Sequence, residues 1–153
     1  MTETDIGGVV RFSVELPPRG LRTNSRAQNR GWRAALTREY AEAVWIAGYA
    51  SITKAVREKA REPRAVVVLG NPWEKAHLTL TWKHAGVAPD RDNVIHNCKA
   101  LIDVLHARSK RPLSLVVDDS PAHLTIEAFT EKVRRRVDEC VVVELHELRE
   151  GDG

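Results

Sequence analysis

The stretch from Ala88 to Leu105, APDRDNVIHNCKALIDVL, predicts an amphipathic helix with closely spaced carboxylates at its beginning. These are Asp90 and Asp92, and a second acidic pair, Asp118 and Asp119, follows in VVDDSP after a short excursion. Carboxylates that converge from separate elements are suited to hold Mg²⁺ against a phosphate. The pattern therefore favours a metal-dependent enzyme that acts on a phosphate-bearing polymer.

Two stripes of side chains run along the predicted helix. The apolar stripe consists of Val94, Cys98, Leu101 and Leu105, widened by Ile95 and Ile102. The polar stripe consists of Asp92, His96, Lys99, Asp103 and His106. Residues three and four positions apart share one face of a helix. Because the polar face begins in the acidic cluster, His96 and Lys99 are expected one and two turns below the carboxylates.

The acidic residues also have a purely structural interpretation. Asp is a preferred N-cap, acids in a first turn complement the helix dipole, and DDSP is typical of a turn. The helix from Asp92 to about Ala107 would be roughly 22 Å long. The residues 108–118 that follow could extend roughly 36 Å. The chain can therefore return to the beginning of the helix, which permits the two acidic clusters to converge.

Hydrophobic periodicity predicts a single α+β domain over residues 1–153, with flexible tails at 1–8 and 149–153. Strands are expected at Val9–Leu16, Ala65–Leu69, His77–Trp82, Leu113–Asp119, His123–Thr130 and Cys140–His146, and a long helix from about Arg33 to Arg61. The second and third strands would form a hairpin. Because strands outnumber helices, a mixed β-sheet packed by two helices, in the order β-α-β-β-α-β-β-β, is favoured over a doubly wound fold.

Composition narrows the class of protein. Hydrophobic residues make up 42% and charged residues 29% of the chain, which is typical of a globular domain. We expect no membrane association, because no apolar run reaches membrane-spanning length and the N-terminus is unlike a signal peptide. Cys98 and Cys140 form no CxxC pair, so a structural zinc site is not expected. The chain is expected in a reduced, cytoplasmic setting.

Basic residues are distributed unevenly. The net charge is only +3, but residues 19–38 contain six arginines and no acid. Such a stretch favours phosphate contacts, for which guanidinium groups are well suited. The candidate contacts within it are Arg22, Asn24, Arg26, Arg30 and Arg33. Two further clusters, at 108–111 and 134–136, have an alternative interpretation as solvated surface, and we favour it for the second.

The order D-x-D-N, a helical lysine with an aspartate four residues later, and a strand that ends in D-D resembles the RusA-like Holliday-junction resolvases. The matching residues are Asp90-Arg91-Asp92-Asn93, Lys99 with Asp103, and Asp118-Asp119. The stretch ELPPRGLRTNSRAQNRGW also resembles the opening strand, prolines and basic loop of that family. The resemblance covers most of residues 12–146, and such genes are commonly carried by phages and prophages. It therefore implies the cytoplasm of a bacterial or phage-infected cell.

The resemblance implies a homodimer that cuts four-way DNA junctions with Mg²⁺ or Mn²⁺. Asp90, Asp92 and Asp119 would be the essential metal-binding carboxylates, with Asp118 as a close neighbour. Within the same motif, Arg91 and Asn93 would contact DNA.

One residue departs from the family pattern. The family has a catalytic lysine four residues after the second Asp, where this chain has His96. Lys99 lies about one turn further on and keeps its four-residue spacing to Asp103. Either residue could therefore be the catalytic cation.

Three other functions remain open at this stage. The chain could be a DNA-binding protein without catalytic activity on the same fold, or a nuclease or phosphatase with another substrate, such as flaps or replication forks. In a third interpretation, the acids cap helices in an unrelated structural protein.

Overall fold

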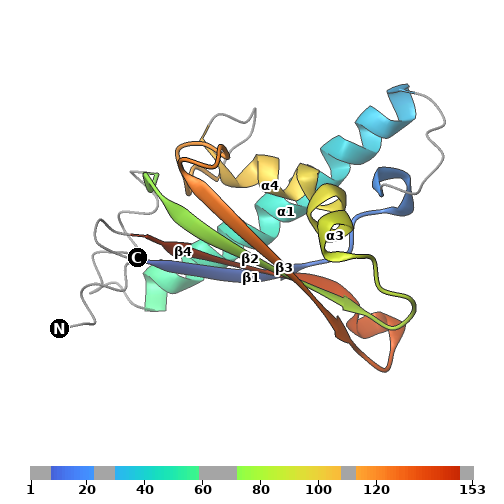
Figure 1. The fold of residues 1–153 in the computed structure, drawn as a ribbon. Coiled ribbons are helices and arrows are strands. Elements are labelled where there is room, and N and C mark those ends of the chain that lie inside the picture. The colour runs from blue at the N-terminus through green and yellow to red at the C-terminus, as the bar shows by residue number, and fades with distance from the viewer. Residues whose placement is uncertain (1–7, 23–29, 59–71, 108–112, 149–153) are drawn as a thin grey trace.

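A four-stranded β-sheet forms one layer of the computed structural model, which describes residues 8–22, 30–58, 72–107 and 113–148 (Figure 1). The strands are β1 (Val9–Val14), β2 (Ala76–His84), β3 (Leu124–Lys132) and β4 (Cys140–Glu147), in the spatial order β1-β4-β2-β3. β4 pairs antiparallel with β1 and β2, whereas β2 and β3 are parallel. The expectation of an α+β domain with a mixed sheet is confirmed.

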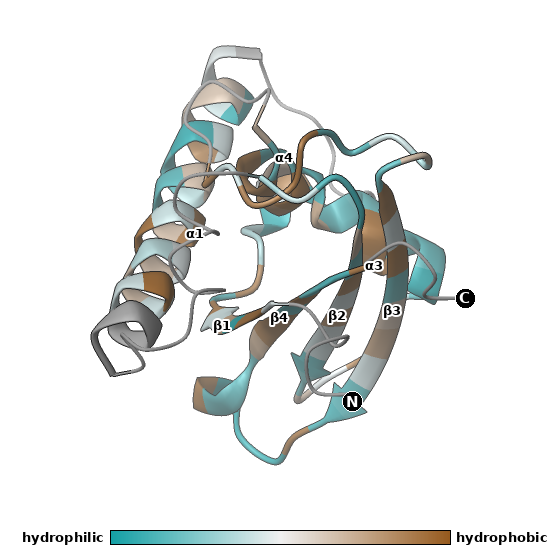
Figure 2. Ribbon diagram, turned by 90° about the vertical axis from the view of Figure 1, so that its left-hand side faces the viewer, coloured by the Kyte–Doolittle hydropathy of each residue, from teal (hydrophilic) through white to brown (hydrophobic). Residues whose placement is uncertain are grey.

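The helices lie on one side of this sheet (Figure 2). They are α1 (Arg30–Glu58), α3 (Arg91–Asn97) and α4 (Lys99–Leu105), with short 3-10 turns at η2 (Arg19–Leu21) and η3 (Arg136–Asp138). α1 packs on β1 and α4, and α3 packs on β3 and β2. α3 and α4 together connect the parallel strands β2 and β3, because a parallel pair needs a crossover connection.

Alternation along the strands places the core between the sheet and the helices. In β1, every second side chain is buried, and in β2 the buried positions include Leu78 and Leu80. The alternate positions carry polar side chains such as Arg11 and Thr79, which are exposed or half-buried. A strand that is covered on only one face buries every second side chain, which explains this period of two. In the part of the chain that the structure describes, no helix is long and apolar enough to cross a membrane.

The helix boundaries differ in two places from those expected. α1 begins at Arg30, three residues before the expected start. The second helix is divided at Cys98, which has φ −95° and ψ 14°. The Cys98 N–H still donates to the Val94 carbonyl, and the Ile102 N–H donates to the Cys98 carbonyl. The two helices therefore follow each other with a local distortion, and the described helical layer contains three helices rather than two.

The strand expected at Leu113–Asp119 is wrong. Only Val116 forms β-bridges there, and these are isolated ones to Trp73 and His106. The physical reason is that this segment closes the end of α4. The Leu113 N–H donates to the Val104 carbonyl, and the Leu115 N–H donates to the Leu105 carbonyl. The last carbonyls of a helix lack partners within the helix, and here the returning chain supplies them.

Several expected features lie outside the described residues. They are the strand Ala65–Leu69 with its hairpin to β2, and the tails at 1–7 and 149–153. Gly8, which we assigned to the N-terminal tail, is buried and makes two hydrogen bonds with Glu147. Its N–H donates to the Glu147 carboxylate, and its carbonyl accepts from the Glu147 N–H. These two hydrogen bonds therefore extend the pairing with the end of β4 to Gly8, the residue before β1.

Candidate metal centre

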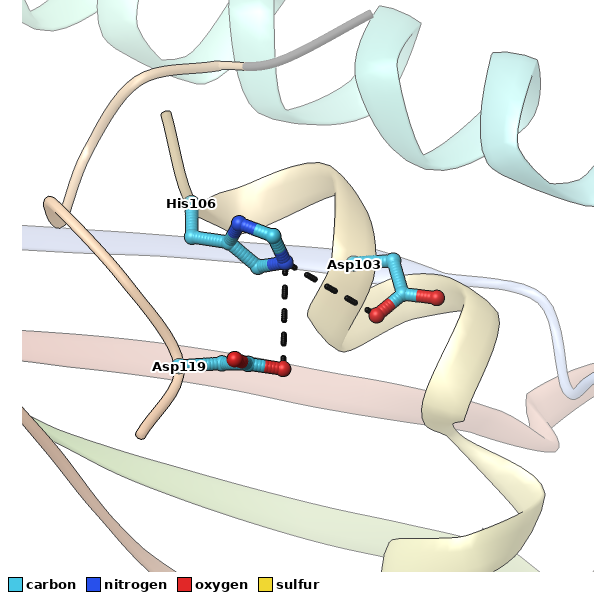
Figure 3. Close-up of side chains that lie close together, drawn as sticks. All are labelled: Asp103, His106 and Asp119. Carbon is cyan, nitrogen blue, oxygen red and sulfur yellow. Dashed lines mark ion pairs between the residues drawn. The ribbon is translucent and has the colours of Figure 1, made fainter. Parts of the chain in front are cut away.

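Asp103, His106 and Asp119 converge at the C-terminal end of α4 (Figure 3). The Nε2 atom of His106 lies 3.8 Å from Asp103 Oδ1 and 3.8 Å from Asp119 Oδ2. One ligand atom from each of the three side chains can be chosen so that all lie within 4.8 Å of one another. Among the described residues, this is the group of His, Cys, Asp and Glu side chains that could hold a metal ion.

The returning segment creates this arrangement. Val116 is buried and is held by bridges to Trp73 and His106. Asp119 follows three residues later, so it is kept beside the last turn of α4. Asp103 lies in the last turn of α4 and His106 is its C-cap residue, so both side chains lie at the end of this helix. The end of α4 thus supplies two of the side chains, and the returning segment supplies the third. The bridges of Val116 fix the path of the returning segment and so set the separation of the three side chains.

The spacing suits a divalent cation. Ligand atoms that surround a cation at about 2.0–2.2 Å are about 3–4 Å from one another. The two 3.8 Å distances from His106 lie in this range, and they are too long for hydrogen bonds. The three groups are therefore close without using one another as hydrogen-bond partners. A small inward movement would bring one nitrogen and two oxygens onto a single ion.

One side of this group is buried, and the other side is open to solvent. The side chain of His106 is 11% exposed, whereas those of Asp103 and Asp119 are 44% and 40% exposed. An ion at this site would rest on the imidazole and remain accessible to a phosphate from solution. Figure 3 shows the imidazole turning Nε2 toward both carboxylates and Nδ1 away from them.

The Nδ1 atom of His106 is buried and has no hydrogen-bond partner among the described residues. A buried polar atom without a partner costs roughly 1–3 kcal/mol. Metal-binding histidines usually donate their second N–H to a carbonyl or carboxylate, which fixes the tautomer. Here that support is missing, so the orientation of the ring depends on packing and on the two carboxylates.

The first acidic pair lies elsewhere. Asp90 is the N-cap residue of α3, and Asp92 is in its first turn; both are exposed. Along α3 and α4, Asp92 and Asp103 are separated by about 16 Å, at about 1.5 Å per residue. The structure therefore does not bring Asp90 or Asp92 into the group that contains Asp119. The returning chain is long enough to reach them, but its hydrogen bonds hold it at the opposite end of the helix.

The capping interpretation of Asp90 holds only for its backbone. The Asp90 carbonyl accepts from the Val94 N–H at 2.9 Å, which begins the helix. Its carboxylate makes no capping hydrogen bond in this described region. Asp118 has a structural role that Asp90 lacks, because Asp118 Oδ1 accepts a hydrogen bond from the Asp119 N–H at 2.9 Å. Asp118 shapes the turn that presents Asp119, and it is not a member of the metal-capable group.

The two candidate catalytic cations are both exposed. His96 is in the last turn of α3, and Lys99 is the first residue of α4. Neither makes an ion pair with a carboxylate in the part of the chain that the structure covers. Lys99 is one turn from Asp103, so it is the nearer of the two along the helix to the group.

The expected DNA contacts have varied positions. Arg91 is exposed, and its guanidinium carbon lies 5.4 Å from the centre of the Phe129 ring. Arg33 and Asn93 are half-buried. Arg22 packs on Trp82 and is described below. Asn24, Arg26 and the Arg30 side chain lie outside the described residues.

Sequence reasoning missed His106, and it used Asp103 only as a spacing marker. Both belong to the polar stripe of the helix, which changes from exposed at Asp92 to buried at His106. The available signal was the Asp-x-x-His spacing at the end of the helix, because a helical i, i+3 pair can bind one ion together. No protein-family model and no curated protein sequence matches the chain.

Proposed function

We propose that the protein is a metal-dependent endonuclease that hydrolyses phosphodiester bonds in branched DNA, with the four-way junction as its substrate. The observation that carries this proposal is the position of Asp119. This residue of the D-D motif lies within metal-binding reach of Asp103 and His106. The D-x-D-N…D-D resemblance to RusA-like resolvases supplies the substrate class, and the partly exposed carboxylates supply an opening for a phosphate.

The cation is proposed to be Mg²⁺, with Mn²⁺ as the alternative. Two carboxylates suit both ions, whereas an imidazole ligand favours Mn²⁺ over Mg²⁺. A divalent cation held there would neutralise phosphate oxygens and lower the pKa of a water molecule. Because Mg²⁺ retains several waters, the three side chains Asp103, His106 and Asp119 are sufficient protein ligands.

The protein groups have separate tasks in this proposal. Asp103 and Asp119 supply negative charge for the cation, and His106 supports it from the buried side. Lys99 is proposed to offer a positive charge to the phosphate, because it is exposed and lies one turn from Asp103. Asp90 and Asp92 remain candidate catalytic carboxylates on the strength of the resemblance, and their contribution is tested separately from metal binding.

The assembly is proposed to be a homodimer. Resolution of a four-way junction needs two cuts in opposed strands, and two sites related by a two-fold axis would make them. Light scattering at micromolar concentration should therefore give a mass twice that of the 17.2 kDa chain.

The proposal is tested with a synthetic four-way junction, a flap, a replication fork and a linear duplex of matched length. We expect cleavage of the junction with Mg²⁺ or Mn²⁺, none with EDTA, and none by Asp119→Asn. Preferential cutting of the flap or fork would retain the nuclease and change its substrate. Tight junction binding without metal-dependent cleavage of any substrate would identify a DNA-binding protein and contradict the proposal.

A further inference from the structure

A cavity of about 310 Å³ lies beyond the end of β2, between the loop that leads to α3 and the turn η3. Its walls include Arg22, Trp82, His84, Asn97, Arg136 and Glu139. This volume is at the lower end of the range for small-molecule sites, roughly 300–1,000 Å³. It can admit one phosphate with an attached sugar, and it is too small for a duplex.

The charges around the cavity are unequal. Two guanidinium groups, of Arg22 and Arg136, face one carboxylate, of Glu139. That carboxylate is already engaged, because Glu139 Oε2 accepts a hydrogen bond from the Ala85 N–H at 2.8 Å. Glu139 therefore fixes the loop after β2, and the cavity retains an excess of positive charge. Such an excess favours an anionic ligand.

Arg22 is held in position before any ligand arrives. Its guanidinium carbon lies 5.4 Å from the centre of the Trp82 ring, and Trp82 is only 2% exposed. Its Nε donates a hydrogen bond to the Pro17 carbonyl at 2.9 Å. Among the described residues, none accepts a hydrogen bond from its terminal nitrogens, which are the donors that a phosphate would use. A guanidinium fixed through its Nε and its ring contact loses little freedom on binding a phosphate.

Burial lowers the pKa of Arg22, and the neighbouring charge of Arg19 lowers it further, whereas Glu139 and Tyr40 act in the opposite direction without cancelling the shift. A cation removed from water in this way is stabilised by an anion placed against it. Arg136 differs from Arg22 because it is exposed in η3. The cavity thus combines one fixed, partly desolvated arginine with a second arginine at its rim.

We propose that this cavity binds a phosphate group, with Arg22 and Arg136 as its ligands. Two sources share this chemistry, a backbone phosphate of DNA and a free nucleotide. The DNA source rests on the proposed nuclease function. Asn97 in the cavity wall precedes Asp103 by six residues, a helical rise of about 9 Å, so the cavity and the metal-capable group are served by the same pair of helices.

Nuclear magnetic resonance of the tryptophan indole N–H groups tests the cavity directly. The Trp82 signal is identified with Trp82→Phe, and inorganic phosphate is then titrated with EDTA present at constant ionic strength. We expect a saturable shift of the Trp82 signal that needs at least fivefold more phosphate in Arg136→Ala. Arg134→Ala removes an equal charge from a neighbouring exposed position and should behave as the wild type.

The same variants separate the two ligand sources. If the source is DNA, Arg136→Ala weakens binding of the four-way junction in EDTA at least fivefold and lowers the salt slope of log K by about one unit. If dTMP saturates the Trp82 shift while junction affinity is unchanged, the ligand is a free nucleotide. No saturable shift in the wild type, or equal losses in Arg134→Ala and Arg136→Ala, would overturn the proposal.

Two further measurements keep the outcomes distinct. Arg22→Ala also removes the contact with Trp82, so its circular dichroism must match the wild type before its binding is interpreted. Cleavage by Arg136→Ala at saturating protein should stay metal-dependent. Failure of the wild type to cleave any substrate would end the nuclease proposal and leave the phosphate titration unaffected.

Discussion

His106 Nε2 lies 3.8 Å from Asp119 Oδ2, and the same nitrogen lies 3.8 Å from Asp103 Oδ1. The imidazole is therefore equidistant from carboxylates of two separate segments. Its place at the C-terminal end of α4 matters as much as its chemistry, because one of the Val116 bridges that hold the returning segment is to His106 itself. The metal-capable group and the end of α4 are thus one structural unit.

The Asp92→Asn substitution distinguishes most clearly between a role in cleavage and a role in metal binding. Asp92→Asn should abolish junction cleavage, as the resemblance implies, and leave junction binding near wild type or tighter, because a negative charge that faces phosphate is lost. Since Asp92 is not in the metal-capable group, thermal stabilisation by Mn²⁺ should persist in this variant. Gel-shift and cleavage assays on one junction test the first expectation, and wild-type cleavage by Asp92→Asn would exclude a catalytic role.

The catalytic cation is tested by two substitutions. Lys99→Ala should lower the single-turnover cleavage rate at pH 8 by roughly a hundredfold, the scale of one lost electrostatic donor. His96→Ala should cost less, because His96 lies further along the helices from Asp103 than Lys99 does. Both side chains are exposed, so neither change should alter the unfolding temperature appreciably. If His96→Ala abolished activity and Lys99→Ala were mild, His96 would take the place of the family's lysine.

The Cys98 thiol predicts a loss of stability at alkaline pH. Burial raises its pKa to about 12, from an ordinary value of 9.0. The folded state therefore keeps a proton that the unfolded state loses, so this contribution is complete below about pH 9 and is lost as the pH rises toward 12. The free energy of unfolding from urea titrations should fall from pH 8 to 10, by at most about 1.4 kcal/mol per pH unit from this thiol.

The control for this prediction is a pair of variants. Cys98→Ala removes the buried thiol and should flatten the decline, whereas Cys140→Ala removes the half-buried one and serves as the reference. An equal decline in Cys98→Ala and the wild type would show that other groups dominate the alkaline loss.

Tyr40 links α1 to the residue that follows β1 and predicts a measurable change in stability. It is 2% exposed, and its hydroxyl donates to the Glu15 carbonyl at 2.8 Å. Tyr40→Phe should lower the free energy of unfolding by about 1–2 kcal/mol, because the hydrogen bond is lost and the carbonyl loses its partner. Tyr49→Phe, at an exposed position on the same helix, should change it by less than about 0.5 kcal/mol. If both substitutions lowered the free energy of unfolding equally, the stabilising role of the Tyr40 hydrogen bond would be contradicted.

Much of the fold could be predicted because its elements carry local signals. The alternation in Val9–Val14 and Ala76–His84 and the helical spacing in α1 reflect burial on one face, which each segment encodes by itself. The segment at Leu113–Asp119 misled the prediction because it has the apolar composition of a strand. Its hydrogen bonds to the end of α4 are a tertiary event, and no local pattern reveals them.

The candidate site could be predicted only in part, because its assembly depends on tertiary contacts that no local pattern reveals. Asp119 was recognised from its motif, but its neighbours depend on where the chain returns. A length argument allowed Asp119 to reach either end of the helix, and the bridges of Val116 place it at the end that carries His106. The expected cluster with Asp90 and Asp92 would have required the returning segment to run to the N-terminal end of α3 instead.

The most direct test of the account is a calorimetric Mn²⁺ titration of the wild type, Asp119→Asn, His106→Ala and Asp92→Asn, each followed by a junction-cleavage assay. A ligand at a hundred times its Kd stabilises the folded state by about 2.7 kcal/mol, so thermal unfolding provides a parallel reading. We predict one saturable site per chain in the wild type and in Asp92→Asn, and its loss together with cleavage in Asp119→Asn and His106→Ala. Unchanged Mn²⁺ binding in Asp119→Asn and His106→Ala would contradict the account.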